Sequence, residues 1–142
     1  MSADTTRQTM QSYLDALVTG GDFASYFTED VAWTTMGIDQ EVHGREAVRD
    51  FIIWFHTQAF DAHPQVKNII VADGQAAFKV DFVGTHTGDF LGIAPTGRSV
   101  TVPYCVAYDL RNDKIAALRA YMPMELFSRQ LGSATGSAQG ST

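Results

Sequence analysis

A lysine and an aspartate two residues apart stand in a stretch with the composition of a β-strand. From Ala76 to Gly88 apolar and polar residues alternate, so Lys79 and Asp81 share one face of the predicted strand. An apolar pocket raises the pKa of a carboxyl and a nearby lysine lowers it, a balance that suits proton transfer near neutral pH. On a solvent-facing strand the same two residues are an ordinary surface ion pair. The residues alone leave both interpretations open.

Two tyrosines and a histidine also have side chains that suit a reaction. Tyr104 and Tyr108 share a face of a later strand, where a phenol in an apolar cavity either donates to an enolate oxygen or packs in the core. His86 either borders a pocket or orders the glycine-rich segment after it. The histidines lack the spacing typical of a metal site, and we predict neither a metal nor a cofactor.

The elements that position these residues follow from periodicity and from turn residues. Amphipathic helices are predicted over residues 4–19, with Asp4 as the N-cap, and over 45–60, and a short helix over 124–131. Strands are predicted over 30–36, 41–43, 65–72, 76–88, 99–110 and 115–122. Early helices and a late antiparallel meander predict an α+β fold, in which helices cover the concave face of a curved sheet.

An apolar pocket is expected between this face and the helices. Its wall is predicted to contain Trp33, Thr35, Phe51, Trp54, His86, Val106, Tyr108, Leu118, Ala120 and Met122. By strand parity the opposite face carries small, weakly polar residues, namely Thr101, Pro103, Cys105 and Ala107. We expect this convex face to meet a second copy of the chain in a homodimer.

Composition limits the kinds of partner. The 142 residues are expected to form one domain over 1–131, followed by a disordered tail over 132–142 that has no residue larger than glutamine. A net charge of −6 argues against binding to nucleic acid or to an anionic membrane. The start of the chain has no secretory signal and no apolar run reaches membrane-spanning length, so a cytoplasmic location is expected.

Several motifs, in order along the chain, resemble the SnoaL-like polyketide cyclases of the nuclear transport factor 2-like superfamily. The early motifs are Tyr13, Tyr26-Phe27, Val31-Ala-Trp33, His43-Gly44-Arg-Glu-Ala-Val48 and Phe51. The later motifs are Gly84-Thr-His-Thr-Gly88, the run from Phe90 to Gly97, Asp113-Lys-Ile115 and Gln130-Leu-Gly132. The resemblance implies a cone-shaped, curved mixed sheet that wraps an apolar pocket with three to four helices. The same superfamily contains ketosteroid isomerases and limonene-epoxide hydrolases.

The resemblance also implies where a catalytic carboxylate would lie. In SnoaL-like cyclases a carboxylate on the last strand performs acid/base chemistry in an aldol ring closure without a cofactor, and Ala120 occupies that position here. Limonene-epoxide hydrolases use an Arg-x-Asp pair, which Lys79-Val-Asp81 matches with lysine in place of arginine. The second aspartate of that enzyme also falls on Ala120.

These observations predict a cofactor-independent cyclase or isomerase that acts on an apolar, carbonyl-bearing molecule. Asp81 would act as acid or base, and Lys79 or Tyr104 would stabilise the developing oxyanion. Two alternatives stay open: an epoxide hydrolase of the limonene-epoxide type, and a non-catalytic protein that binds an apolar small molecule.

Overall fold

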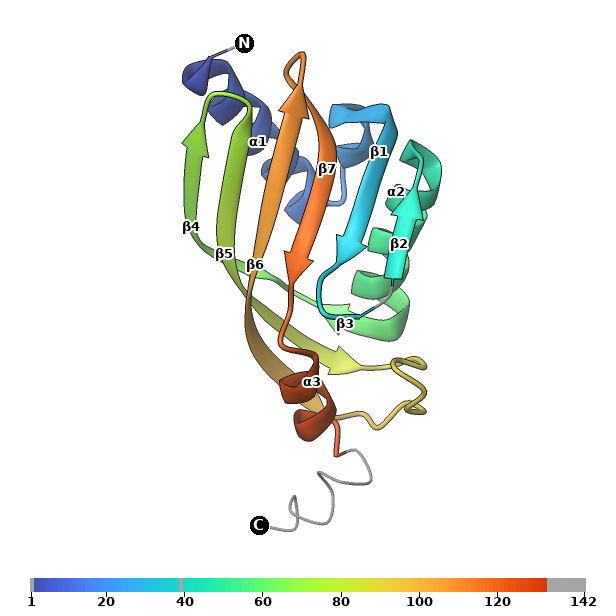
Figure 1. Cartoon of the computed structure of the whole chain (residues 1–142). Helices are drawn as coiled ribbons and strands as arrows, with labels where there is room; N and C mark the ends of the chain where they lie inside the picture. Colours follow the sequence, from blue (N-terminus) through green and yellow to red (C-terminus); the bar gives the residue numbers. More distant parts are fainter. Residues whose placement is uncertain (1, 39, 133–142) are drawn as a thin grey trace.

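A computed structural model describes residues 2–38 and 40–132. Its central feature is one curved, seven-stranded sheet (Figure 1). The strand order is β2-β1-β7-β6-β5-β3, and β4 pairs with β5 beside this path. The strands are β1 (Phe27–Thr35), β2 (Gln40–His43), β3 (Phe60–Ala62), β4 (Gln65–Ala72), β5 (Gln75–His86), β6 (Ser99–Arg111) and β7 (Lys114–Tyr121). Except for Gly132, the predicted tail lies outside the described residues.

The sheet is mixed, as the resemblance implied. Strands β1 and β7 pair in parallel, with Thr35 opposite Ala120, and the other pairings among the described residues are antiparallel. The helices α1 (Ala3–Thr19) and α2 (Arg45–Trp54) lie behind the sheet in Figure 1, and α3 (Met124–Gln130) lies beside the lower part of β6. The α+β architecture is confirmed. Across the described residues, no helix has both the length and the apolar character needed to cross a bilayer.

The N-cap of helix α1 lies two residues earlier than predicted: it is Ser2, not Asp4. The Ser2 hydroxyl accepts the backbone N–H of Thr5 at 3.2 Å, and the Thr5 hydroxyl accepts the backbone N–H of Ser2 at 2.9 Å. This reciprocal pair satisfies two of the free N–H groups at the helix start. Asp4 lies within the first turn, where a negative charge is favourable near the helix N-terminus.

The second predicted helix is not α-helical to its end. Helix α2 stops at Trp54, a π-helix follows over Phe55–Ala59, and the chain then enters the short strand β3, which the sequence did not predict. The backbone N–H groups of Thr87 and Gly88 both donate to the carbonyl of Ala59 at 3.0 Å. The Thr87 hydroxyl donates to the carbonyl of Gln58 at 2.9 Å. The segment after β5 therefore caps the π-helix.

Phenylalanine rings pack together where the π-helix, β3, β5 and α3 meet. Phe55 from the π-helix stacks on Phe82 of β5 with ring centroids 4.8 Å apart, and Phe60 meets Phe82 edge-on at 5.1 Å. The fully buried Phe127 of α3 packs against the same rings. This aromatic core fixes the π-helix against the inner face of the sheet.

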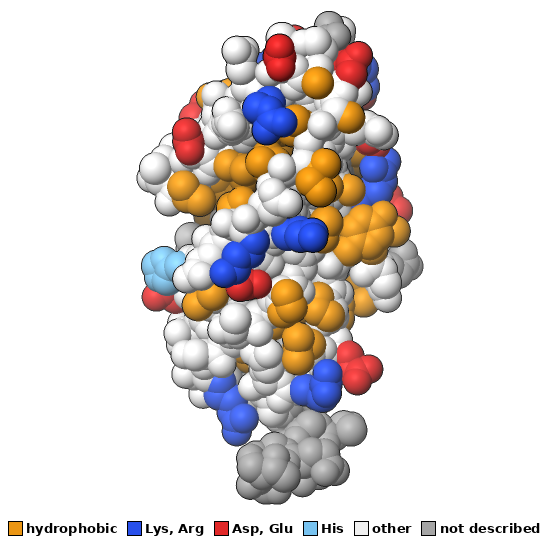
Figure 2. Space-filling view, turned by 90° about the vertical axis from the view of Figure 1, so that its left-hand side faces the viewer, with side chains coloured by type: hydrophobic (Ala, Val, Ile, Leu, Met, Phe, Trp, Pro, Cys, Tyr) orange, Lys and Arg blue, Asp and Glu red, His pale blue; other side chains and the backbone are white. Residues whose placement is uncertain are grey.

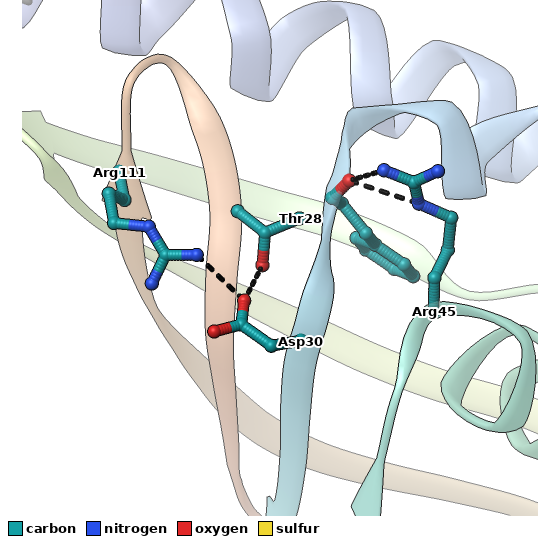
Figure 3. A network of polar contacts seen from close by, with 5 residues as sticks. Thr28, Asp30, Arg45 and Arg111 are labelled. Atoms are coloured by element: carbon teal, nitrogen blue, oxygen red, sulfur yellow. Dashed lines mark hydrogen bonds and ion pairs between the residues drawn. The ribbon is translucent and has the colours of Figure 1, made fainter.

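Polar contacts at the other end of the sheet join its first strand to two distant segments (Figure 3). The Arg45 guanidinium donates to the carbonyl of Phe27 at 2.9 and 3.2 Å, which links the first turn of α2 to the start of β1. Asp30 accepts the Thr28 hydroxyl at 2.8 Å and pairs with Arg111 at 2.7 Å. The hydrogen bond from Arg111 lowers the pKa of Asp30, and the hydrogen bond from Thr28 adds a smaller effect in the same direction.

Candidate functional site

Four polar aromatic side chains meet in the apolar interior. His56, Tyr13, Tyr104 and Tyr108 border a cavity of about 30 Å³ between α1, α2 and the inner face of the sheet, which we call the interior cavity. The rest of its lining is Leu14, Leu17, Val18, Trp33, Ile52, Pro64, Val66, Phe78 and Val106. The ring of Phe82 packs near both His56 and Tyr104, with centroids 5.9 and 6.3 Å away.

The π-helix places His56 at this cavity, and a backbone carbonyl sets its tautomer. Nδ1 of His56 lies 2.8 Å from the carbonyl oxygen of Ile52. Since a carbonyl only accepts, Nδ1 must carry the proton, and Nε2 of the neutral ring keeps its lone pair. Burial lowers the pKa of His56, an effect that the bond to Ile52 only partly opposes. His56 is therefore a neutral imidazole whose Nε2 can accept a proton.

The three tyrosines of the interior cavity stay protonated. Burial raises the pKa of Tyr13, Tyr104 and Tyr108 above the ordinary value of 10.0. A hydrogen bond with Tyr108 opposes this rise in Tyr13, and the two rings lie 5.8 Å apart. Neutral phenols in an apolar cavity are hydrogen-bond donors, so the cavity combines one base with several donors.

A larger hollow adjoins the interior cavity. This entrance hollow has a volume of about 320 Å³. It is lined by Leu17, Val18, Gly20, Phe23, Ile52, Ile53, His56, Thr57, Ala62, His63 and Pro64. Five of these residues also line the interior cavity, and His56 is one of them. His56 thus borders both the entrance hollow and the interior cavity.

Half of the predicted pocket wall, five residues of ten, surrounds a second cavity of about 90 Å³, which we call the aromatic cavity. It is lined by Trp33, Thr35, Ile38, Gln40, Phe51, Trp54, Phe55, Phe90, Leu91, Met122 and Met124. Trp33 borders both cavities, while Val106 and Tyr108 belong to the interior one. The role of these residues in binding stays a prediction.

Lys79 and Asp81 do not face the interior, which was one of the two interpretations that the residues left open. Asp81 pairs across the sheet with Pro103, and Lys79 with Cys105, so both side chains share the outer face with these residues. The inner face of β5 carries Phe78, Val80 and Phe82, which are buried. This result follows from the alternation of strand side chains and from the preference of the more apolar face for the core.

Asp81 instead lies in an open hollow on the outer face. Basic and acidic side chains adjoin there between patches of hydrophobic ones (Figure 2). This outer hollow, of about 770 Å³, is lined by Met36, Gly37, Lys67, Lys79, Val80, Asp81, Pro103, Tyr104, Cys105, Tyr121, Met122 and Pro123. The ion-pair partner of Asp81 is Lys67, at 3.3 Å, and the Asp81 side chain is 27% exposed.

Three further predicted wall residues border neither cavity. Leu118 and Ala120 are fully buried in the sheet beside Trp33 and Thr35, their partners on β1. His86 is fully buried, and its Nδ1 accepts the backbone N–H of Thr96 at 3.1 Å. This bond ties His86 to the loop after β5, and a role of His86 in binding stays a prediction.

Sequence patterns did not indicate His56 and Tyr13 as residues of the interior cavity. Tyr13 lies in the apolar stripe of α1, and this pattern predicts a core residue. The only sequence signal for His56 was its place near the end of an amphipathic helix. The π-helix that turns it toward the cavity depends on Thr87 and Gly88, far away along the chain.

Comparison with known proteins agrees with this architecture. A family model described as SnoaL-like polyketide cyclase matches residues 8–131. A solved structure assigned as a SnoaL-like polyketide cyclase, from Jannaschia sp., has a TM-score of 0.80 at 18% identity, covering 91% of this chain and 92% of that one. TsrD from Streptomyces laurentii has a TM-score of 0.76 at 20% identity, with 94% and 98% covered.

A more distant structure has an isomerase assignment. The protein from Kribbella flavida assigned as a ketosteroid isomerase has a TM-score of 0.67 at 18% identity, covering 85% of this chain and 79% of that one. No curated protein matches the sequence. At these identities the solved structures establish a shared fold only. The activity has to be inferred from the residues of the site.

Proposed function

Because the chain belongs to the SnoaL-like polyketide cyclase family, we propose that it is a cofactor-independent cyclase or isomerase of apolar, carbonyl-bearing small molecules. The observation that carries this proposal is the neutral His56 at the meeting point of the entrance hollow and a cavity with three protonated tyrosines. His56 takes the role of acid/base that the sequence had given to Asp81.

The reaction begins with a proton transfer to His56. Nε2 of His56 takes a proton from the carbon next to a substrate carbonyl, and the carbonyl oxygen gains the negative charge of an enolate. The hydroxyl of Tyr104 or Tyr108 donates a hydrogen bond to that oxygen. In an isomerase the imidazolium returns the proton to another carbon. In a cyclase the enolate carbon attacks a second carbonyl, and the imidazolium protonates the resulting alkoxide.

The residues that line the two cavities and the entrance hollow favour an uncharged substrate. Among the described residues, no Asp, Glu, Lys or Arg borders the interior cavity, the aromatic cavity or the entrance hollow. A charged group would lose its hydration there without gaining a partner of opposite charge. The entrance hollow, at about 320 Å³, falls within the size range of small-molecule sites.

A second candidate function uses the outer hollow. Lys79, Asp81 and Lys67 lie together there in a space of about 770 Å³, and Tyr104 borders it as well. Asp81 as a base that activates water, with a lysine near the epoxide oxygen, would give the epoxide hydration that the Lys79-Val-Asp81 match implied. A non-catalytic binding protein is the third candidate, and an apolar interior without a carboxylate favours it.

Two variants separate these candidates. The wild type, His56→Asn and Asp81→Asn are incubated in D2O with a panel of enolisable ketones, β-keto esters and terpene epoxides, and products are read by mass. We expect deuterium uptake or a product of unchanged mass in the wild type and in Asp81→Asn, and its loss in His56→Asn. Loss in Asp81→Asn alone, with a gain of one water, would support epoxide hydration. Binding without turnover of any member would favour the third candidate.

A further inference from the structure

The aromatic cavity has one polar strip in an otherwise apolar wall. Nε1–H of Trp33 donates to the hydroxyl oxygen of Thr35 at 2.8 Å, and the Thr35 hydroxyl donates to Oε1 of Gln40 at 2.9 Å. All three residues line the cavity. Thr35 and Gln40 are directly opposed on the paired strands β1 and β2, so the backbone holds the strip in place.

The direction of each hydrogen bond in this strip follows from the chemistry of the groups. An indole N–H only donates, so the Thr35 oxygen must accept it. The single hydroxyl proton of Thr35 then needs an acceptor, and Oε1 of Gln40 provides one. The amide of Gln40 is thereby fixed with its NH2 group at the free end of the chain of bonds. Among the described residues that NH2 group has no hydrogen-bond partner.

The rest of the wall suits a small, uncharged group. Trp33 and Phe51 pack with ring centroids 5.2 Å apart, and Trp54 lies beside Phe51 at 5.8 Å. An apolar cavity of about 150 Å³ holds a molecule of benzene, so the 90 Å³ of this cavity corresponds to a smaller group. Without a cation in the lining, a carboxylate would be buried unpaired, at a high cost in free energy.

A tight turn forms the rim of the same cavity. Leu91, which lines it and is 43% exposed, has a φ of 53°. Leu91 and Gly92 form the two-residue turn between Phe90 and Ile93, whose backbone groups hydrogen-bond to each other, and this turn requires a positive φ at both positions.

From these observations we propose that the aromatic cavity is a binding subsite for a small neutral group with one hydrogen-bond acceptor, such as a ketone, ester or amide carbonyl. The Gln40 NH2 group donates to the acceptor, and the aromatic rings enclose the apolar part. This subsite is separate from His56, and its existence does not depend on the proposed reaction.

Binding of two matched probes tests the subsite without any turnover. Butan-2-one carries the acceptor, and 2-methylbut-1-ene has nearly the same shape with a CH2 group in place of the oxygen. Titrations are followed by the ¹H–¹⁵N resonances of the Trp33 indole and the Gln40 side-chain amide. We expect both resonances to shift, and the ketone to bind at least about fivefold tighter than the alkene, the range for one neutral hydrogen bond.

Variants of the strip show whether Gln40 is the donor. Gln40→Met keeps the length of the side chain and removes the donor, and Gln40→Glu places acceptors there. Both should abolish the preference for the ketone, and Thr35→Val should reduce it by releasing the amide. Gln75→Met, at an exposed glutamine of β5, should keep it. Equal binding of the two probes by the wild type, or a preference that survives in both Gln40 variants, would overturn the proposal.

Discussion

The carbonyl oxygen of Ile52 lies 2.8 Å from Nδ1 of His56, one helical turn further along the chain. The backbone N–H of Phe55 donates to the same oxygen. The helix that carries His56 therefore also fixes the tautomer and rotation of its ring, without a partner from another element. A carboxylate often performs this task for a catalytic histidine, whereas here a neutral carbonyl does so.

Replacement of His56 should abolish proton transfer. In His56→Asn we expect kcat for deuterium exchange to fall by about 10²- to 10⁴-fold, the usual contribution of a general base. His63→Asn is the matched control, because His63 borders the same entrance hollow but its side chain is 80% exposed. Exchange rates of both variants, measured beside circular dichroism to verify folding, provide the comparison. A similar loss in His63→Asn would argue against a specific role for His56.

Replacement of Tyr104 should affect the developing oxyanion more than substrate binding. In Tyr104→Phe we expect kcat to fall by up to about 10²-fold with little change in KM, because the hydrogen bond strengthens as charge develops. Tyr121→Phe is the control, since Tyr121 is 49% exposed on the outer face. Steady-state kinetics of the two variants measure the difference. A change confined to KM would assign Tyr104 to binding alone.

The stability of the protein should fall with pH below 6.5 because of His56. Burial lowers the pKa of His56 from 6.5, so the native chain keeps the neutral ring where the unfolded chain takes up a proton. Below that pH the unfolded state binds more protons, and the free energy of unfolding decreases as pH falls toward the native pKa. Above 6.5 the contribution of His56 is fully present. Urea unfolding between about pH 5 and 8 should give a flatter dependence in His56→Asn, and an unchanged slope would contradict this assignment.

A methyl group at Gly88 should disturb the π-helix. A Cβ atom there would collide with the carbonyl oxygen of Gln58, a backbone atom that cannot turn aside. For Gly88→Ala we expect a loss of about 2 to 4 kcal/mol in the free energy of unfolding, in the range of strain and overpacking effects. Gly21→Ala is the control, because its new atom would meet Ala16 at an ordinary 3.5 Å. Denaturant unfolding compares the two, and equal losses would show that Gly88 has no special role.

We propose that the outer face forms a homodimer, as its small, weakly polar residues led us to expect. Tyr121 is half exposed at the edge of the outer hollow, which also holds Pro103 and Cys105. Sedimentation at micromolar concentration should give twice the chain mass of 15.5 kDa. Tyr121→Arg should shift it to a monomer, whereas Gln11→Arg, at an exposed position on α1, should not. A wild-type monomer would refute this proposal.

How much of the site the sequence predicts depends on whether the contacts that shape it join residues near in the chain or far apart. Alternation within β6 correctly placed Tyr104 and Tyr108 inside and Pro103 outside, because parity is a local property. The face of Asp81 depends in addition on the register between β5 and β6. Asp81 lies directly opposite Pro103, and directly opposed residues point to the same face of a sheet. Because Pro103 is on the outer face, Asp81 must be there too.

The end of α2 shows a second limit. Periodicity predicted one helix to Phe60, and the residues through Trp54 follow it. The switch to a π-helix and to β3 depends on hydrogen bonds from Thr87 and Gly88, which local sequence does not reveal. His56 became a site residue through this switch, and so the residue proposed as the base was the one that sequence patterns did not indicate.

The parallel pairing of β1 with β7 has a consequence for synthesis on the ribosome. Strand β1 ends at Thr35 and its partner β7 begins only at Lys114, so most of the chain is made before the two can meet. Until then β1 has β2 on one side and an unpaired edge on the other, whereas β5 and β6 follow each other along the chain and need not wait for a distant partner. An incomplete chain therefore exposes the edge of β1, the place where it would pair with another nascent chain or need a chaperone.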